Sequence, residues 1–375
     1  ITPIQEAINT VAGGLTPDDG TIYVEGGVYA EDIAVNNVAT LTLQGSANGS
    51  PSTLNGLVNI LNSSNITLRD FIFGHVVRVS DSSDVTLQGT PTNDSITVTL
   101  QGNVLNLSVD GGAGSDAVTL NMEASSATAT VTDSGASAGD SLTVNTTGAN
   151  DQVTVTATTV SIGDTQTINT SGIESQTINT GAGDDTLTLS GAVGVLDVNG
   201  GAGTTTISAD TNVVSPGGQV SIEGDGALII EAGSVIDVSG AENGNGGEVI
   251  INSAATQFDG TILARGGSQS GDGGFVEVSG RSVAFGGTVD TRAPNGAAGM
   301  LVIDPDTINF GTTDSTVGTT QNVSAATVVT QLATSNVSYT AAVQMNVTST
   351  IDASAASGAN GRSLTLTAPA INLGA

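Results

Sequence analysis

Short runs in which apolar and polar residues alternate, separated by glycine-rich turns, fill most of this 375-residue chain. In Val98–Leu100 and Val153–Val155, for example, every second residue is apolar. A period of two predicts β-strands with one face turned inward, and the Gly, Asn and Asp residues between them predict tight turns. The pattern therefore indicates an all-β protein.

The strand-like runs repeat at a regular distance in the second half of the chain. Gly233, Gly260 and Gly287 recur at a constant interval of about 27 residues, which is within the range of one solenoid repeat. A Gly-Gly block at Gly246 returns at Gly273 after the same interval. Such a period, made of short strands and turns, is typical of a solenoid in which one repeat is one coil. We therefore predict a β-solenoid.

The first half of the chain repeats less evenly. Runs that begin at Leu41, Ile66 and Val85 share one phase, although the second interval is shorter than the first, and the next run, at Val98, follows sooner still. The interval between the last two runs is too short for a full coil. We therefore expect the runs at Val85 and Val98 to lie on different faces of one coil.

One short amphipathic helix is predicted at the N-terminus. Thr2 can cap it, Pro3 suits its first position and Gln5 completes a capping box. Its apolar stripe, with Ile4 and Ile8, is expected to cover the exposed end of the solenoid core. The predicted organisation is a capping helix at residues 1–12, irregular coils with isolated Gly/Asp-rich turns at 13–208, regular coils at 209–310 and further coils, truncated within a longer protein, at 311–375.

Composition narrows the class of partner. The net charge is −30, from 36 acidic residues against six arginines, and there is no lysine or cysteine. A polyanion repels nucleic acid and anionic membranes and attracts divalent cations. No nucleic acid and no membrane insertion are therefore predicted, since no stretch is long and apolar enough to span a bilayer. Aromatic residues make up only 2%, which suits a narrow aliphatic core.

The last two fifths of the chain resemble the repetitive shaft of filamentous-haemagglutinin-like surface proteins, which are secreted by the two-partner route. The resemblance rests on Gly-Gly blocks at Gly217–Ile222, Gly246–Ile251 and Gly273–Val278, and on Gly-Met-Leu-Val-Ile-Asp-Pro at Gly299–Pro305. It implies a right-handed parallel β-helix outside the cell. The partners implied are a host or neighbouring cell surface, a polysaccharide, or further copies in a fibre.

The first half resembles, more generally, the entry to a pectate-lyase-type parallel β-helix. The residues that carry this resemblance are Ile4–Ile8 and Thr21–Glu31. Lyases, esterases, phage spikes and adhesins share that entry, so it implies a fold and no particular function.

Two turns match the calcium-binding nonapeptide of repeats-in-toxin proteins. Gly111–Val118 fits its Gly-Gly-x-Gly-x-Asp-x-apolar pattern, and Thr180–Leu187 fits with the first glycine replaced. The candidate metal ligands are therefore Asp116, Asp184 and Asp185, with Ca²⁺ as the cofactor. The matches are isolated, whereas calcium sites of this type come from consecutive repeats. The alternative is that these residues form ordinary turns and the protein has no cofactor.

No catalytic residues are predicted, and the protein is not expected to be an enzyme. The residues that come closest to forming a catalytic site are Arg69, Asp70, Arg78 and Asp81, which are close to His75 in the sequence. Such a set of charged residues is more often a salt-linked surface. We predict a rigid, structural and adhesive segment of a large secreted bacterial cell-surface or extracellular fibre protein. The alternatives are a carbohydrate-active β-helix enzyme, a polysaccharide lyase or hydrolase, and a calcium-stabilised linker.

Overall fold

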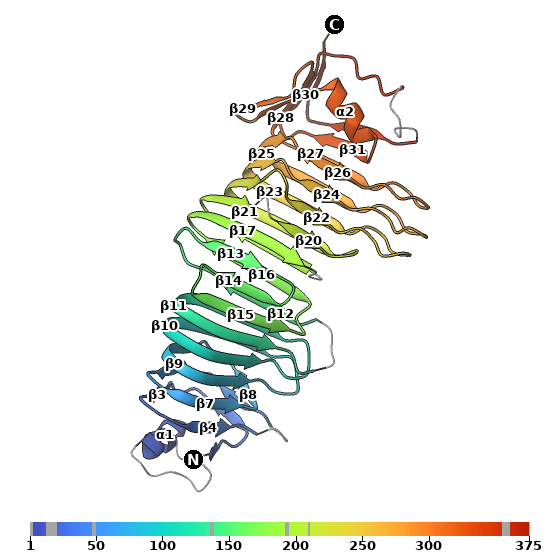
Figure 1. Cartoon of the computed structure of the whole chain (residues 1–375). Coiled ribbons are helices and arrows are strands. Elements are labelled where there is room, and N and C mark those ends of the chain that lie inside the picture. The colour runs from blue at the N-terminus through green and yellow to red at the C-terminus, as the bar shows by residue number, and fades with distance from the viewer. Residues whose placement is uncertain are drawn as a thin grey trace. The chain divides into compact units, whose positions relative to one another are not determined.

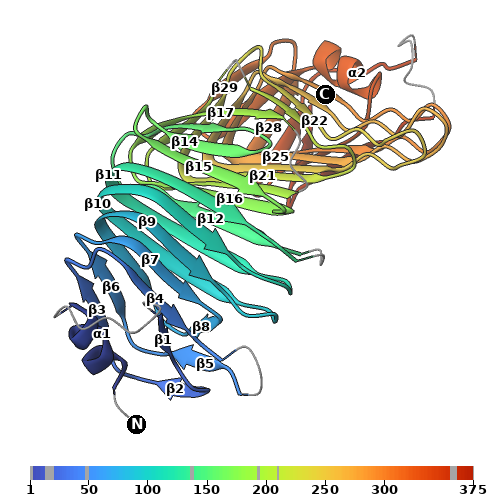
Figure 2. The same cartoon turned by 60° about the horizontal axis from the view of Figure 1, so that its bottom comes forward.

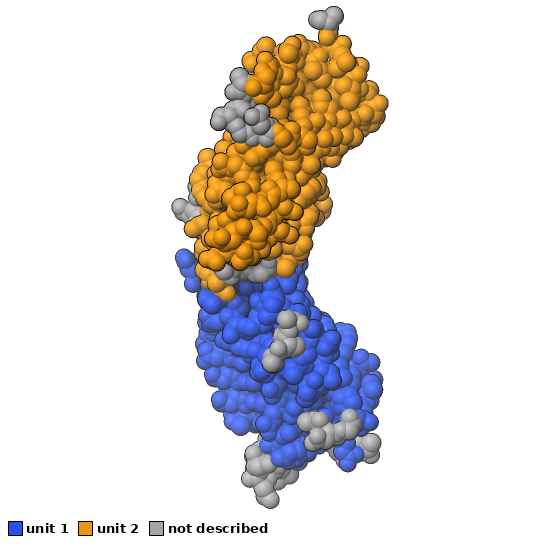
Figure 3. Space-filling model, turned by 90° about the vertical axis from the view of Figure 1, so that its right-hand side faces the viewer, with its two compact units in different colours: residues 1–147, 158–179 blue, residues 148–157, 180–375 orange. Residues whose placement is uncertain are grey.

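The computed structural model describes residues 3–12, 21–46, 50–135, 139–191, 195–208, 211–354 and 361–374. The chain divides into two compact units (Figure 3). Unit 1 contains Ile1–Thr147 and Thr158–Asn179, and unit 2 contains Gly148–Ala157 and Thr180–Ala375. Strands dominate both units, and the described residues contain two short helices. The predicted all-β class is confirmed.

Unit 1 is a stack of strands with one helix, drawn from blue to green in Figure 1. The helix is α1 (Ile4–Ala12). The strands are β1 (Thr21–Tyr23), β2 (Gly27–Tyr29), β3 (Ile33–Asn36), β4 (Leu41–Gln44), β5 (Ser52–Leu54), β6 (Val58–Leu61), β7 (Ser64–Arg69), β8 (Phe71–Phe73), β9 (Val77–Gln88), β10 (Ser95–Asp110), β11 (Ala117–Thr132), β12 (Ser141–Asn145), β14 (Thr159–Ile162), β15 (Gln166–Ser171) and β16 (Ser175–Gly181), the last of which runs across the unit boundary.

Two columns of buried aliphatic side chains form the core of unit 1. In each column a residue pairs in parallel with the residue at the same position one coil later, where a coil is the chain between two such paired positions. The first column is Ile33, Val58, Val77, Val98, Leu120, Val144 and Ile178. The second column is Leu41, Ile66, Val85, Leu107, Ala129 and Ile168.

These columns settle where the closely spaced runs of the first half lie. Val85 belongs to the second column and Val98 to the first. The prediction that they occupy different faces of one coil is therefore confirmed. Gln166 and Gln176, which are also close in the sequence, likewise lie on different strands, where they pair with Ala127 of β11 and Leu142 of β12.

The pairing is not parallel throughout, contrary to what a regular solenoid would show. β14 pairs with β15 in an antiparallel hairpin, with Val160 opposite Ile168. The two strands are joined only by Gly163–Thr165, and so short a connection permits only antiparallel pairing.

Helix α1 lies beside β3 and covers the first coil (Figure 2). The Glu31 carboxylate accepts hydrogen bonds from the backbone N–H groups of Ile4 (2.8 Å) and Gln5 (3.3 Å). The Gln5 side chain binds both backbone groups of Ala34: its oxygen accepts from the N–H and its nitrogen donates to the carbonyl. Because Thr2 lies outside the described residues, the expected capping box of Thr2 and Gln5 stays a prediction.

Unit 2 contains the second helix, α2 (Ala325–Leu332). Its strands are β13 (Gln152–Val155), β17 (Asp184–Gly191), β18 (Val195–Gly200), β19 (Thr204–Ile207), β20 (Asn212–Val214), β21 (Gln219–Ile230), β22 (Val235–Asp237), β23 (Glu248–Phe258), β24 (Thr261–Leu263), β25 (Phe275–Phe285), β26 (Thr288–Asp290), β27 (Met300–Asp304), β28 (Thr307–Gly311), β29 (Ser315–Val317), β30 (Thr320–Ser324), β31 (Asn336–Thr340), β32 (Gln344–Val347), β33 (Leu364–Thr367) and β34 (Ile371–Leu373).

The glycine blocks of the sequence repeat lie in one column of unit 2. Val220, Val249, Val276 and Leu301, each two residues after such a block, pair in parallel one after another. In three of these coils the glycine two positions before the paired residue has no room for a side chain. A Cβ atom on Gly247, Gly274 or Gly299 would lie 2.0 Å from the carbonyl oxygen of the glycine one coil earlier. Close backbone stacking therefore requires glycine at this position.

The chain after Phe310 resists phasing from the sequence because one coil there is longer. Met300 of β27 pairs with Asn336 of β31, a wider interval than the one between Phe275 and Met300, which pair one coil earlier. Between Met300 and Asn336 lie an antiparallel hairpin of β29 and β30 and the helix α2, which was not predicted. Ser324 caps α2, and the buried Tyr339 hydroxyl donates to the side chain of Gln331 on this helix. Neither described helix has the length and apolarity needed to cross a membrane.

Candidate metal centre

One turn position carries a carboxylate in successive coils of unit 1. The backbone N–H of Asp94 donates to Oδ1 of Asp116 (2.7 Å), and that of Asp116 donates to Oδ1 of Asp140 (2.7 Å). The N–H of Asp140 in turn donates to Oε2 of Glu174 (2.9 Å). Each carboxylate thus satisfies a backbone amide of the preceding coil. We refer to Asp94, Asp116, Asp140 and Glu174 as the acidic ladder.

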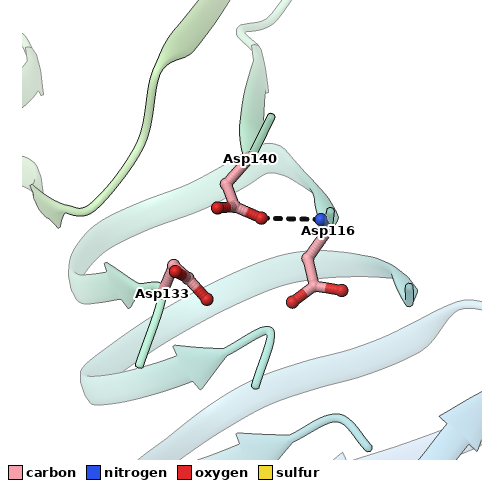
Figure 4. Close-up of side chains that lie close together, drawn as sticks. All are labelled: Asp116, Asp133 and Asp140. Atoms are coloured by element: carbon pink, nitrogen blue, oxygen red, sulfur yellow. Dashed lines mark hydrogen bonds between the residues drawn. The ribbon is translucent and has the colours of Figure 1, made fainter. Parts of the chain in front are cut away.

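Asp133 lies against the middle of the acidic ladder and completes a cluster of three carboxylates with Asp116 and Asp140 (Figure 4). One oxygen of each residue lies within 4.8 Å of the oxygens of the other two. Asp116 directly precedes β11, Asp133 directly follows it, and Asp140 precedes β12. The start and the end of β11 therefore lie close to each other and to the start of β12.

The cluster is largely withdrawn from solvent. Asp116 is 4% exposed and Asp140 1% exposed, whereas Asp133 is half-buried. Oδ2 of Asp116 and Oδ2 of Asp140 are buried, and neither accepts a hydrogen bond from any described residue. Both salt bridges in the described part of the chain involve Asp290 of unit 2, so no arginine neutralises these three carboxylates.

Burial and mutual repulsion change the acidity of the acidic ladder. Burial raises the pKa of Asp94, Asp116 and Asp140, and hydrogen bonds from backbone N–H groups only partly offset it. The charge of Asp133 raises the pKa of Asp116 and of Asp140 further. At the end of the acidic ladder, the hydrogen bond from the backbone N–H of Asp140 lowers the pKa of Glu174. The centre of the cluster therefore favours a proton or a cation.

The glycine that opens the Gly111–Val118 motif makes room for the carboxylate of the same turn. A Cβ atom on Gly111 would lie 2.4 Å from Oδ2 of Asp116. Gly89 has the same relation to Asp94 in the preceding coil, with a distance of 2.8 Å to its Oδ2. At these two turns, the absence of a side chain on the glycine thus leaves space for the buried carboxylate of the aspartate later in the same turn.

The other two predicted ligands, Asp184 and Asp185, belong to unit 2. The N–H of Asp151 donates to Oδ1 of Asp185 (2.9 Å), and the N–H of Thr204 donates to Oδ1 of Asp184 (3.1 Å). Asp185 is buried, and burial raises its pKa. Asp185 pairs with Thr205 in the following coil, so this position carries no carboxylate there. Within the described ranges, Asp184 and Asp185 do not join a third His, Cys, Asp or Glu in a cluster.

Sequence reasoning missed Asp133 and Asp140, which lie with Asp116 in the cluster. Asp140 did carry a signal, because Asp94, Asp140 and Asp151 all precede an apolar residue by two positions, as Asp116 does. They lack the full glycine pattern that singled out Asp116. Asp133 carried no signal, because its place in the cluster depends on the return of the chain after β11.

Three of the residues weighed for catalysis, Arg69, Asp70 and Asp81, take part in hydrogen bonds between coils. Arg69 donates to the side chain of Gln44 (2.7 Å), and Gln44 donates to Asp70 (3.3 Å). Asp81 accepts from the backbone N–H of Asn103 (3.0 Å). These contacts give each residue a structural role, and the expectation that the protein is not an enzyme stays a prediction.

The one described group with strong ion pairs is Asp290 of unit 2. It accepts from Arg265 (2.7 Å) and from Arg292 (2.6 Å), and both guanidinium groups are about half exposed. Although burial acts to raise the pKa of Asp290, these arginines hold it below the ordinary value. Here arginine supplies the positive charge that the cluster in unit 1 lacks.

Comparisons with protein-family models, with curated proteins and with solved structures found no match to this chain.

Proposed function

We propose that the coils of both units wind as a right-handed parallel β-helix. The observation that supports this is the repeated parallel pairing of equivalent positions, for example Val220 with Val249 and Val249 with Val276. The chain between two such paired positions is long enough to pass once round the core and to form the next strand beside the first. Crossovers between parallel strands are right-handed in almost all proteins.

We propose further that the chain is a structural and adhesive segment of a large secreted bacterial cell-surface or extracellular fibre protein. The stacked coils supply a stiff scaffold, since the strands of successive coils are hydrogen-bonded to one another. The resemblance of residues 217–375 to filamentous-haemagglutinin-like shafts supports the extracellular location. The partners proposed are a cell surface, a polysaccharide or further copies of the same chain.

Two measurements test this proposal. Small-angle X-ray scattering of the purified chain should give a particle several times longer than it is wide, because stacked coils grow along one axis. Beads coated with the native chain should aggregate, or adhere to bacterial cells or polysaccharide, more than beads coated with heat-unfolded chain. A compact particle would remove the scaffold, and equal adhesion by native and unfolded chains would remove the adhesive role.

A further inference from the structure

The cluster of Asp116, Asp133 and Asp140 presents an unbalanced charge in a confined place. Two of the three side chains are more than nine-tenths buried, and each of these two has one oxygen without a hydrogen-bond partner among the described residues. A buried polar atom that lacks a partner costs free energy, and a buried charge costs more. Something other than the described side chains must satisfy these two oxygens.

Geometry indicates what that partner is. The oxygens of the three carboxylates converge within 4.8 Å of one another. Calcium binds oxygen at about 2.3 to 2.6 Å, so two ligands on opposite sides of one ion stand roughly 5 Å apart. The observed spread thus fits oxygens that share a single Ca²⁺, without a change in the backbone.

The hydrogen bonds leave one oxygen of Asp116 and one of Asp140 available to an ion. Oδ1 of Asp116 and Oδ1 of Asp140 each accept a backbone N–H within the acidic ladder, and Oδ1 of Asp133 accepts the N–H of Gly135 (3.0 Å). These bonds fix the three carboxylates in place. Oδ2 of Asp116 and Oδ2 of Asp140 have no such bond. Metal sites commonly orient their ligands by hydrogen bonds of this kind.

We propose that Asp116, Asp133 and Asp140 bind one Ca²⁺, which joins the start and end of β11 to the coil that begins at β12. Calcium accepts six to eight oxygens in flexible geometry, so water molecules complete its shell. The ion offsets the repulsion between three carboxylates. This site uses only Asp116 from the nonapeptide motif, and its other two ligands come from outside that motif.

The test is a calorimetric titration of the full chain with CaCl₂, after chelation, at neutral pH and physiological salt. Salt at this level screens diffuse attraction to the acidic surface. The unaltered chain should show one saturable site. Asp133→Asn should weaken binding on the order of tenfold or more, because it removes one charged ligand but keeps an oxygen that can accept the Gly135 N–H. The matched control is Asp272→Asn, an exposed turn aspartate of unit 2 that accepts the N–H of Ala297.

A second measurement does not depend on any variant. Hydrogen exchange of the unaltered chain should show slower exchange with Ca²⁺ at Ala117–Leu120 and Ser141–Val144 than in chelator. No saturable binding, or equal binding by the Asp133→Asn and unaltered chains, would overturn the proposal. So would a chelated Asp133→Asn chain that is more stable than the unaltered chain while Ca²⁺ changes the stability of neither, because the repulsion between the carboxylates would then be relieved by no calcium ion.

Discussion

Amide and carboxylate side chains, at the scale of single residues, continue the backbone ladders from coil to coil. In unit 1 the Asn145 side chain donates to Asn121 (2.7 Å), and that of Asn179 donates to Asn145 (2.5 Å). A second row, in unit 2, consists of Asn322, Asn309, Asn346 and Asn372. A primary amide suits such a row because it donates on one side and accepts on the other. A carboxylate only accepts, so it repeats only where backbone N–H groups point at it.

This difference gives the acidic ladder a distinctive response to pH. The pKa values of Asp94, Asp116 and Asp140 are raised above the ordinary 3.8 in the folded state. Between 3.8 and the raised values, the folded chain binds more protons than the unfolded chain, so stability rises as the pH falls into this window. In chelator, the melting temperature should therefore increase as the pH falls from neutral into the window between the raised values and 3.8.

Groups with lowered pKa values act in the opposite direction only at lower pH. Asp290 and Asp314 contribute stability above 3.8, and Glu174 above 4.5, and they lose it only as the pH falls further. High salt reduces the effect of overall charge. In chelator and at high salt, Asp140→Asn should reduce the increase in melting temperature that accompanies the fall in pH, because the amide does not titrate. A melting temperature that falls steadily from neutral pH in the unaltered chain would contradict the assignment.

Two features at the scale of secondary-structure elements decide how coils begin and how closely they stack. Helix α1 is fastened to the first coil by Glu31 and Gln5, and Ile4 and Ile8 are buried beneath it. The glycine column of unit 2 allows successive turns to approach until backbone touches backbone. Both features depend on contacts between residues about one coil apart in the sequence.

Glu31→Ala should loosen α1. The carboxylate accepts two N–H groups at the helix N-terminus, and loss of such a cap costs about 1 kcal/mol of the free energy of unfolding. Hydrogen exchange should show faster exchange of the α1 amides, with little change in unit 2. Glu25→Ala removes an equal charge from an exposed position in the same unit. Equal effects of the two substitutions would show that charge, and not capping, is responsible.

Gly274→Ala should destabilise unit 2 by about 2 to 3 kcal/mol, because the added methyl group overlaps a backbone oxygen that cannot move aside. A Cβ atom there would lie 2.0 Å from the carbonyl oxygen of Gly247. Gly148, in the same unit, has nothing within 4 Å of an added Cβ and serves as the control for the same substitution. Urea unfolding measures both. If the two variants unfold at the same urea concentration, the close stacking described here is wrong.

At the scale of the whole molecule, charge is the dominant property. Thirty-six acidic residues face only six arginines. Self-repulsion of this size opposes the compact state and keeps separate molecules apart. The candidate calcium site and the pair of arginines at Asp290 are local compensations for it.

Stability should therefore rise with ionic strength. The screening length falls from about 30 Å at 0.01 M salt to about 3 Å at 1 M, which removes most repulsion between exposed carboxylates. In chelator, the melting temperature should increase over this range with NaCl and equally with KCl, since neither cation is the proposed ligand. An unchanged or lower melting temperature would show that the acidic residues are spaced too widely to repel one another.

The sequence by itself determined the class of the protein and much of its repeat. Alternation with a period of two specifies strands, and glycines at fixed spacing specify where the chain turns, because both depend on local backbone preferences. The separation of the runs at Val85 and Val98 followed from length alone, since the chain between them is too short to complete a coil. Asp116 was found for the same reason, because its glycine turn is a local pattern.

Only the tertiary structure decided which side chains meet across coils. Glu31 binds the N-terminus of α1 from about one coil away, and Asp133 and Asp140 join Asp116, although neither is close to it in the sequence. The insertion of α2 and its hairpin also hides the last coils from any fixed period. Such contacts depend on the length of each coil, which irregular loops change by several residues. A local sequence pattern does not specify the length of a coil. The length is defined by which residues are hydrogen-bonded between successive strands.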